Sequence, residues 1–190
     1  LLLDAASGAP IIVNSAGLNP QNITLDETGD TLAVATGESG DVLLLHAHTL
    51  SLLTRLPMPG MVYDVRLRNG SVHALCLNEA MASTLVTVQS CGVRQTLRLE
   101  GMPGVLAMCG ETLLCATEGY LYVVSADGSR VLRTEKAAGR ADRMIFEKEA
   151  WLLCDSLTEN MVMRDCGGRW RLVCPNVRDM CAYFTREESS

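Results

Sequence analysis

Residues 19–36 read NPQNITLDETGDTLAVAT, and this stretch contains a pattern that recurs along the chain. A corner with Pro comes first, a short apolar strand follows, and a polar turn leads into a second, almost continuously apolar strand. The pattern occurs four times, at intervals of 41, 40 and 39 residues between the equivalent points Gly29, Gly70, Gly110 and Glu149. A period near 40 residues with several short strands in each repeat is typical of an all-β fold, the β-propeller, with one blade per repeat.

Each expected blade has four antiparallel strands, named A to D from the central channel outward. The expected A strands are 22–26, 62–67, 105–108, 143–146 and 179–184, and the expected B strands are 31–36, 72–77, 112–117 and 151–155. A C–D hairpin is expected five times, over 2–13, 42–56, 85–99, 121–134 and 162–174. The apolar B strands indicate that neighbouring blades cover both of their faces. Pro or Gly precedes most A strands, as at Pro59-Gly60 and Pro103-Gly104, and marks an expected corner between blades.

The repeats predict a single β-propeller domain over residues 1–190, with about five blades visible. Four blades are expected over 19–58, 59–100, 101–136 and 137–175, and a fifth is split between 1–18 and 176–190. Pairing the N-terminal outer strands with a C-terminal inner strand would close a five-bladed ring. The alternative is part of a seven-bladed ring, which needs about 280 residues at about 40 per blade. We favour a longer parent chain, because both ends fall within a blade.

The first repeat resembles a YVTN-type propeller repeat. In that family a D-x-x-x-G hairpin leads to a P-x-x-I-x-x-x-x-D/T-G-x-x-L-x-V strand pair, and the chain matches these at Asp4–Gly8 and at 20–34. The later repeats keep the hydrophobic skeleton, so the resemblance implies the propeller architecture along the whole chain. Proteins of this kind are commonly seven-bladed and serve as interaction platforms, surface proteins or, in some branches, lactonases and dehydrogenases. The chain matches no catalytic motif of those branches, so the resemblance assigns no functional residue.

Composition argues against two classes of partner. The net charge is −6 and only 4 % of the residues are aromatic, whereas nucleic acid demands clustered Lys and Arg or aromatic stacking platforms. No apolar run approaches the roughly 20 residues of a membrane helix. We therefore expect neither nucleic acid nor a membrane as partner.

The chain has eight cysteines, most of them inside apolar strands such as Leu75-Cys76-Leu77 and Leu114-Cys115-Ala116. A free thiol packs there as a small hydrophobe. No CxxC pair is present and His occurs three times, so no metal is expected. Reduced, buried thiols favour a cytoplasmic location. Two sequons, at Asn22 and Asn69, point instead to a secreted or cell-surface protein.

A ligand site is expected where the loops that enter the A strands meet the axial channel. The candidate residues there are Asn22, Tyr63, Asp64, Asp142, Arg143, Arg178 and Asp179. Alternating charges in a channel would bind a polar or anionic small ligand, with Arg giving forked hydrogen bonds. The alternative is a neutral ring of ion pairs that only solvates the channel.

Three further groups of residues have a structural and a functional interpretation. His46 and His48 lie in a hairpin turn, where an exposed turn is favoured over a metal patch, and His73 is expected to be a hydrogen-bonded core residue. Methionines expected in loops would give an adaptable binding surface or pack between blades: Met58, Met61, Met81, Met102 and Met161.

The sequence favours a non-catalytic scaffold that binds a protein or a small polar ligand at the channel mouth or at a loop face, with no cofactor. This follows because no G-x-S-x-G motif is present, neither Cys109 nor Cys115 has a basic neighbour, and no phosphate-binding glycine loop is present. Whether the chain is an enzyme stays open. The alternative is a hydrolase or lactonase-like enzyme that uses the axial residues Asn22, Asp64, Asp142 and Asp179. A third expectation is self-association through an open blade edge.

Overall fold

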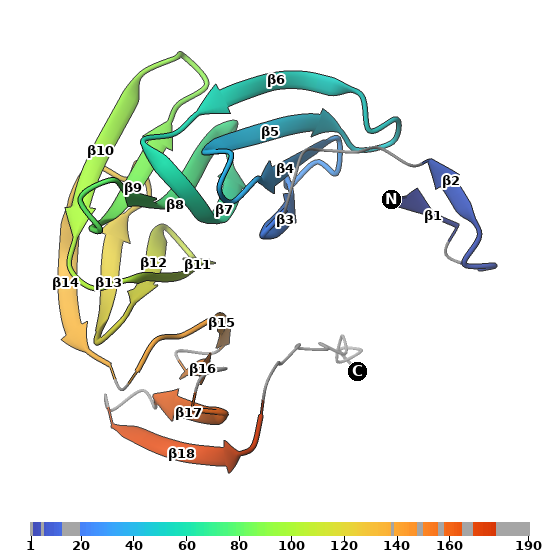
Figure 1. Ribbon diagram of the computed structural model, residues 1–190. Coiled ribbons are helices and arrows are strands. Elements are labelled where there is room, and N and C mark those ends of the chain that lie inside the picture. The colour runs from blue at the N-terminus through green and yellow to red at the C-terminus, as the bar shows by residue number, and fades with distance from the viewer. Residues whose placement is uncertain are drawn as a thin grey trace, which may run out of the picture. The chain divides into compact units, whose positions relative to one another are not determined.

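The computed structural model describes residues 2–4, 6–12, 20–137, 139–147, 150–155, 158–164 and 169–177, and every regular element in them is a β-strand (Figure 1). Nothing helical in the described part has the length and apolar character of a membrane span. The chain forms two compact units, Leu1–Arg140 and Ala141–Ser190, which are described separately below.

The first unit contains one hairpin and three blades, each blade a sheet of four antiparallel strands in chain order. The hairpin joins β1 (Leu2–Leu3) and β2 (Pro10–Ile12). Blade 1 contains β3 (Asn22–Leu25), β4 (Thr31–Ala35), β5 (Asp41–His46) and β6 (Leu52–Pro57). Blade 2 contains β7 (Gly60–Arg68), β8 (Ser71–Asn78), β9 (Ser83–Val88) and β10 (Arg94–Leu99). Blade 3 contains β11 (Pro103–Cys109), β12 (Thr112–Thr117), β13 (Tyr120–Ser125) and β14 (Val131–Lys136).

The second unit contains blade 4, again four antiparallel strands in chain order. Its strands are β15 (Arg143–Glu147), β16 (Ala150–Asp155), β17 (Asn160–Arg164) and β18 (Trp170–Pro175). The blades confirm the all-β fold and the four-stranded antiparallel sheets expected from the repeat. The expected strand 179–184 lies outside the described residues.

The A strands of blades 2 and 3 start earlier than expected. Gly60 and Pro103, taken from the sequence as corner residues, are the first residues of β7 and β11. Proline is tolerated there because the first residue of a strand need not donate to the ladder. The loop placement of two methionines is also wrong, since Met61 lies in β7 and Met161 in β17.

Neighbouring blades of the first unit bury alternate side chains of their strands against each other. Blade 1 contributes Ala33, Ala35 and Val42 to the cluster with blade 2, which contributes Val65, Leu67 and Ala74. The cluster between blades 2 and 3 contains Leu75, Leu85, Leu106, Leu113 and Tyr122. The inner strands β3 and β11 both contact β7, so blade 2 lies between blades 1 and 3.

Blade 1 exposes apolar side chains that blades 2 and 3 bury. Ile23 and Leu25 of β3 are 57 % and 51 % exposed, whereas Val65 and Leu106, at the position of Ile23 in β7 and β11, are 0 % exposed. The preceding blade covers Val65 and Leu106. The face of β3 that carries Ile23 and Leu25 is therefore exposed, whereas the equivalent faces of β7 and β11 pack against the preceding blade.

The tight start of β7 gives the first prediction. A Cβ atom on Gly60 would lie 2.1 Å from the carbonyl oxygen of Leu77, so Gly60→Ala must push β7 away from β8. We expect a loss of at least about 2 kcal/mol in the free energy of unfolding, measured by urea denaturation. Gly92→Ala is the matched control, because its Cβ would meet nothing within 4 Å. Its positive φ should cost about 1 kcal/mol. Equal losses in the two variants would contradict this account of the β7–β8 contact.

Candidate functional site

A β-bulge in β7 sets the position of Asp64. The register with β8 shifts between Val62 and Asp64, since Val62 pairs with Cys76 and Asp64 with Leu75. Tyr63 is the extra residue of the bulge and is half-buried. A bulge re-aims the side chains next to it. Here Asp64 becomes almost fully buried, with 1 % exposure.

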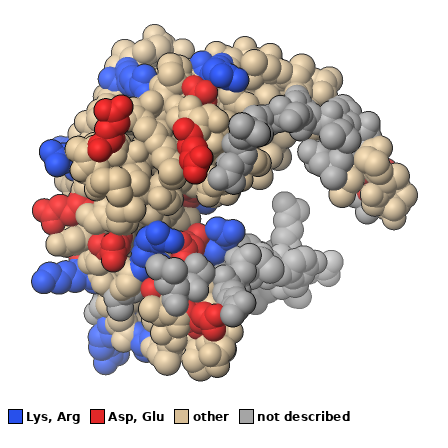
Figure 2. Space-filling model, in the orientation of Figure 1, with Lys and Arg blue, Asp and Glu red and all other residues tan. Residues whose placement is uncertain are grey.

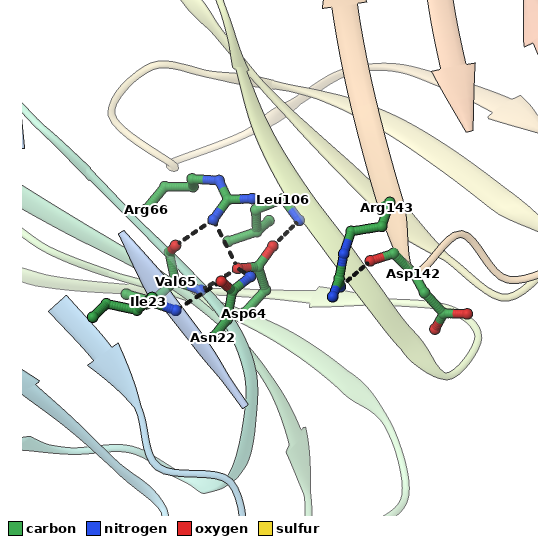
Figure 3. Close-up of polar contacts among 8 residues, drawn as sticks. All are labelled: Asn22, Ile23, Asp64, Val65, Arg66, Leu106, Asp142 and Arg143. Atoms are coloured by element: carbon green, nitrogen blue, oxygen red, sulfur yellow. Dashed lines mark hydrogen bonds and ion pairs between the residues drawn. The ribbon is translucent and has the colours of Figure 1, made fainter. Parts of the chain in front are cut away.

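Four donors converge on the Asp64 carboxylate (Figure 3). Oδ1 accepts hydrogen bonds from Asn22 Nδ2 at 2.5 Å, from the Val65 backbone N–H at 2.7 Å and from Arg66 Nη1 at 3.0 Å. Oδ2 accepts a hydrogen bond from the backbone N–H of Leu106 at 2.7 Å. The donors come from blades 1, 2 and 3, so a single carboxylate connects three inner strands.

The partners of Asp64 in blades 1 and 3 lie at equal distances from it along the chain. Both Asn22 and Leu106 lie 42 residues from Asp64. Asn22 has the same place in blade 1, and its side-chain oxygen accepts the next N–H, from Ile23, at 2.7 Å. The register places Val105 and Arg143 at this position in blades 3 and 4, where they pair with Ala116 and Cys154. The amide and the carboxylate therefore occur only in the first two blades of this series.

The Asp64 network has a structural role. An ionised carboxylate costs several kcal/mol to bury unless hydrogen bonds and an opposite charge replace its water. Arg66 supplies the opposite charge, and its Nη1 also donates to the Val65 carbonyl at 2.9 Å. With both oxygens accepting internal donors, Asp64 is poorly placed to receive a proton from a substrate or to ligate a cation.

The other expected site residues lie in the second unit or beyond the described residues. The Arg143 guanidinium donates to the backbone carbonyl of Asp142 at 2.9 Å, and Figure 3 shows the Asp142 carboxylate pointing away from it. Arg178 and Asp179 lie outside the described residues. The structure thus brings Asn22 and Asp64 together, and it places Tyr63 beside them on the bulge.

Sequence reasoning missed three members of the network, Val65, Arg66 and Leu106. Arg66 is two residues from Asp64 on the same strand, so the strand period of two was a usable signal. Leu106 contributes only its backbone N–H, which leaves no mark in the sequence.

Arg68 makes a second inter-blade contact, at the last residue of β7. Its guanidinium lies 3.1 Å from the Glu111 carboxylate of blade 3 and 3.8 Å from the Glu27 carboxylate of blade 1. It also donates to the Gly110 carbonyl. Asp64 at the middle of β7 and Arg68 at its end thus both connect this strand to the neighbouring blades.

Among the described cysteines, Cys76 and Cys115 are fully buried, whereas Cys91 and Cys174 are exposed. Burial raises the pKa of Cys76 to about 12, and burial together with the nearby Asp64 charge raises the pKa of Cys115. Burial also raises the pKa of the half-buried Cys109, although the Thr112 hydroxyl opposes it. A nucleophilic cysteine needs a lowered pKa and an accessible sulfur.

His73 confirms the expectation of a hydrogen-bonded core residue. It is 1 % exposed, and its Nδ1 lies 3.0 Å from the Thr87 hydroxyl. Burial, with a smaller contribution from Arg68, lowers its pKa from 6.5 to about 4. His46 and His48 form an edge-to-face pair in the β5–β6 turn, and His48 lies 3.8 Å from the exposed Asp30.

Two surface features bear on ligands. No three His, Cys, Asp or Glu side chains in the described part are arranged to hold a metal ion. An open depression of about 240 Å³ is lined by Pro57, Met58, Pro59, Arg94 and Thr96. Figure 2 shows basic and acidic side chains scattered over the face in view, with no continuous basic field.

Comparisons with known proteins identify the fold. No family model matches the chain, and no curated protein matches it either. Among solved structures, BamB from Moraxella catarrhalis superposes with a TM-score of 0.64 at 14 % identity, over 80 % of this chain and 49 % of that one. The Swd1 β-propeller domain from Myceliophteria thermophila superposes with a TM-score of 0.60 at 16 % identity, over 76 % of this chain and 51 % of that one.

A chain of the nidogen/laminin complex superposes with a TM-score of 0.69 at 13 % identity, over 87 % of this chain and 66 % of that one. This chain therefore spans about half the length of BamB and of the Swd1 domain. At these identities the likeness concerns the fold alone, and it shows that the fold is a β-propeller.

The Asp64 network gives the second prediction. Asp64→Asn replaces an acceptor-only group by an amide whose NH₂ must face a donor in either orientation, the Leu106 N–H at the Oδ2 place or the Asn22 and Arg66 donors at the Oδ1 place. We expect a loss of about 3 kcal/mol in the free energy of unfolding, because buried donors lose their acceptor. The control is Asp30→Asn, an exposed carboxylate on the turn between β3 and β4, with an expected change within about 0.5 kcal/mol. Urea denaturation measures both, and a loss below about 1 kcal/mol in Asp64→Asn would refute the network's role.

His73 gives a prediction about pH. The unfolded chain binds a proton at His73 near pH 6.5, whereas the folded chain does so only near pH 4. His73 therefore lowers the free energy of unfolding as the pH falls through this range, by roughly 2 kcal/mol between pH 7 and pH 5. His73→Gln keeps a hydrogen-bonding side chain and should lose less stability between these pH values in urea denaturation. Parallel losses in wild type and variant would show that His73 does not titrate this way.

Proposed function

We propose that the chain is a non-catalytic β-propeller scaffold that binds a protein or a small polar ligand at the channel mouth or at a loop face. One observation carries the proposal. Asp64, one of the axial carboxylates named for the enzyme alternative, is 1 % exposed and accepts hydrogen bonds at both oxygens. The same network connects the inner strands β3, β7 and β11, which is a structural role.

The buried nucleophiles and bases support the same proposal. Cys76 and Cys115 have raised pKa values and are 0 % exposed, and the lowered pKa of His73 accompanies complete burial. A general base or a nucleophile needs contact with the reacting atoms. In this scaffold, binding depends on the loops and turns that the blades hold in place, as is common for rigid β-sheet folds.

Two further proposals concern setting and assembly. A cytoplasmic, reducing setting is supported by the free thiols among the described cysteines, including the exposed Cys91 and Cys174. Self-association is supported by the exposed Ile23 and Leu25 of β3. Light scattering over a range of concentrations tests it, and a strict monomer at all concentrations would refute it.

The scaffold function predicts binding without turnover. Selection of peptides from a random display library on the purified chain should give ligands that saturate one site in calorimetry. Their affinity should be unchanged by EDTA, because no metal takes part. The same chain, incubated with lactone and ester substrates and Ca²⁺, Mg²⁺ or Zn²⁺, should show no hydrolysis above background.

The enzyme alternative predicts the opposite results. Metal-dependent hydrolysis that disappears in Asp142→Asn, a variant outside the Asp64 network, would refute the scaffold proposal. Failure to select any saturable peptide or small polar ligand would also count against it.

A further inference from the structure

The turns and connections at one end of blades 1–3 form a continuous surface. It contains the β4–β5, β8–β9 and β12–β13 turns and the connections between blades, and we define this B–C face as residues 37–40, 57–60, 78–82, 100–102 and 118–119. In a four-stranded antiparallel blade, the turn between the second and third strands and the connection to the next blade lie at the same end.

Backbone contacts link the segments of the B–C face one after another. Met58 N–H donates to the Gly40 carbonyl at 2.7 Å, which joins the blade 1 turn to the entry of blade 2. Gly60 pairs with Asn78 in the ladder of blade 2. The Ser83 hydroxyl donates to the Gly101 carbonyl at 2.5 Å, and Glu118 N–H donates to the Met102 carbonyl at 2.8 Å. The face is therefore held together across three blades.

The B–C face is mainly acidic. Its charged residues are four exposed glutamates, Glu38, Glu79, Glu100 and Glu118, and the defined segments contain no Lys or Arg. Arg140 lies at the border, next to Gly139, whose carbonyl accepts a hydrogen bond from the Gly119 N–H at 2.9 Å. No ion pair among the described residues involves these glutamates. Arg94 contacts the face at one edge, where its Nη2 donates to the Pro57 carbonyl at 2.6 Å. The face thus projects a negative potential from turns that are fixed by the sheets.

Methionines lie among these glutamates. Met81, at the tip of the β8–β9 turn, is 65 % exposed, and Met58 and Met102 are half-buried. Met58 also lines the depression of about 240 Å³ between the end of β6 and the start of β10, which Arg94 lines as well. Unbranched thioethers adapt to partners of different shape, so these side chains offer apolar contact area between the carboxylates.

The turn that carries Met81 has a conformation that favours glycine. Met81 has φ +56° and its N–H donates to the Asn78 carbonyl at 3.0 Å. Gly40 closes the corresponding turn of blade 1 in the same way, with φ +67° and a hydrogen bond to the Gly37 carbonyl at 3.0 Å. A side chain in this region costs about 1 kcal/mol. Folding alone would favour glycine at this position, and methionine instead presents an apolar side chain to solvent.

We propose that the B–C face of blades 1–3 docks a basic peptide segment of a partner protein that also carries apolar side chains. The inference deepens the proposed scaffold function and rests on it. Lys and Arg side chains of the partner pair with the glutamates, and an apolar side chain packs on Met81 or enters the depression beside Met58. Charge complementarity selects the partner, because an acidic segment would meet repulsion across the whole face.

Three labelled synthetic peptides test the proposal on the full chain by fluorescence anisotropy. The first alternates Lys or Arg with Leu, the second replaces the basic residues by Glu, and the third replaces Leu by Ser. We expect saturable binding of the first, none of the second and weaker binding of the third. Raising the salt from about 50 mM to about 300 mM should weaken binding of the first peptide, since it screens exposed charges.

Variants locate the binding to the face. Glu38→Lys/Glu79→Lys/Glu118→Lys should weaken the first peptide at least about tenfold through repulsion. Met81→Gly should weaken it about fivefold while the turn gains its favoured residue, so unfolding cannot explain the loss. Asp30→Lys is a charge-reversal control away from the face, because Asp30 is an exposed acidic residue on a turn at the opposite end of blade 1; it matches Glu79→Lys alone in charge. It should leave binding unchanged.

The outcomes separate this inference from the scaffold function. Binding of the first peptide that weakens in the triple variant and in Met81→Gly, but not in Asp30→Lys, supports the proposal. Binding that all variants retain, or equal binding of the acidic peptide, overturns the B–C face as the site and leaves the scaffold function in place. No binding of the three peptides, while library-selected ligands bind, overturns the basic-peptide inference alone. No binding in either experiment overturns both.

Discussion

The Asp64 carboxylate holds three blades in one arrangement. A carboxylate buried to 1 % exposure requires replacement of all its water contacts, and the replacements come from Asn22 of blade 1, Leu106 of blade 3 and Arg66 of its own strand. Moving a neighbouring blade away would leave part of this charge without donors, at a cost of several kcal/mol. Apolar packing between blades is non-directional. The hydrogen bonds to Asp64 are directional, and they constrain the placement of β3, β7 and β11.

The sequence predicts the blades better than it predicts how they are joined. The B strand 112–117 coincides with β12, because a strand covered on both faces reads as an apolar run between polar turns. The start of β7 was misplaced because Gly60 looks like a corner, whereas it lies in the strand so that the Leu77 carbonyl can approach. The bulge at Tyr63 leaves no local signal, since it depends on the pairing of β7 with β8.

The candidate site shows the same limit. Asn22 and Asp64 could be selected from their residue types and their places at the starts of inner strands. Their mutual hydrogen bond could not, because it requires the register of two strands that belong to different blades. The contribution of Leu106 is a backbone N–H and is independent of its side chain. Residue type and position in the repeat therefore identify polar residues near the axis. Only the structure shows that two of them, Asn22 and Asp64, connect neighbouring blades through a hydrogen bond.

The two ends of the blades use charge in different ways. At the end of β7 that carries Arg68, the carboxylates of Glu27 and Glu111 lie within 3.8 Å of its guanidinium, so acidic groups from two neighbouring blades share a cation. At the B–C face, four glutamates are exposed and take part in none of the ion pairs of the described residues. Like charges held on fixed turns repel one another and disfavour the compact state, although salt reduces the effect.

This difference separates folding from recognition within the same three blades. Charges that are neutralised by other residues of the chain, as at Asp64 and Arg68, stabilise the folded state. The glutamates of the B–C face contribute nothing comparable to folding, and neither does Met81 in a turn that favours glycine. A partner with complementary charge would relieve the repulsion and cover the thioether in one step. The features of the B–C face that are unfavourable in the free chain are thus the ones that would favour the complex.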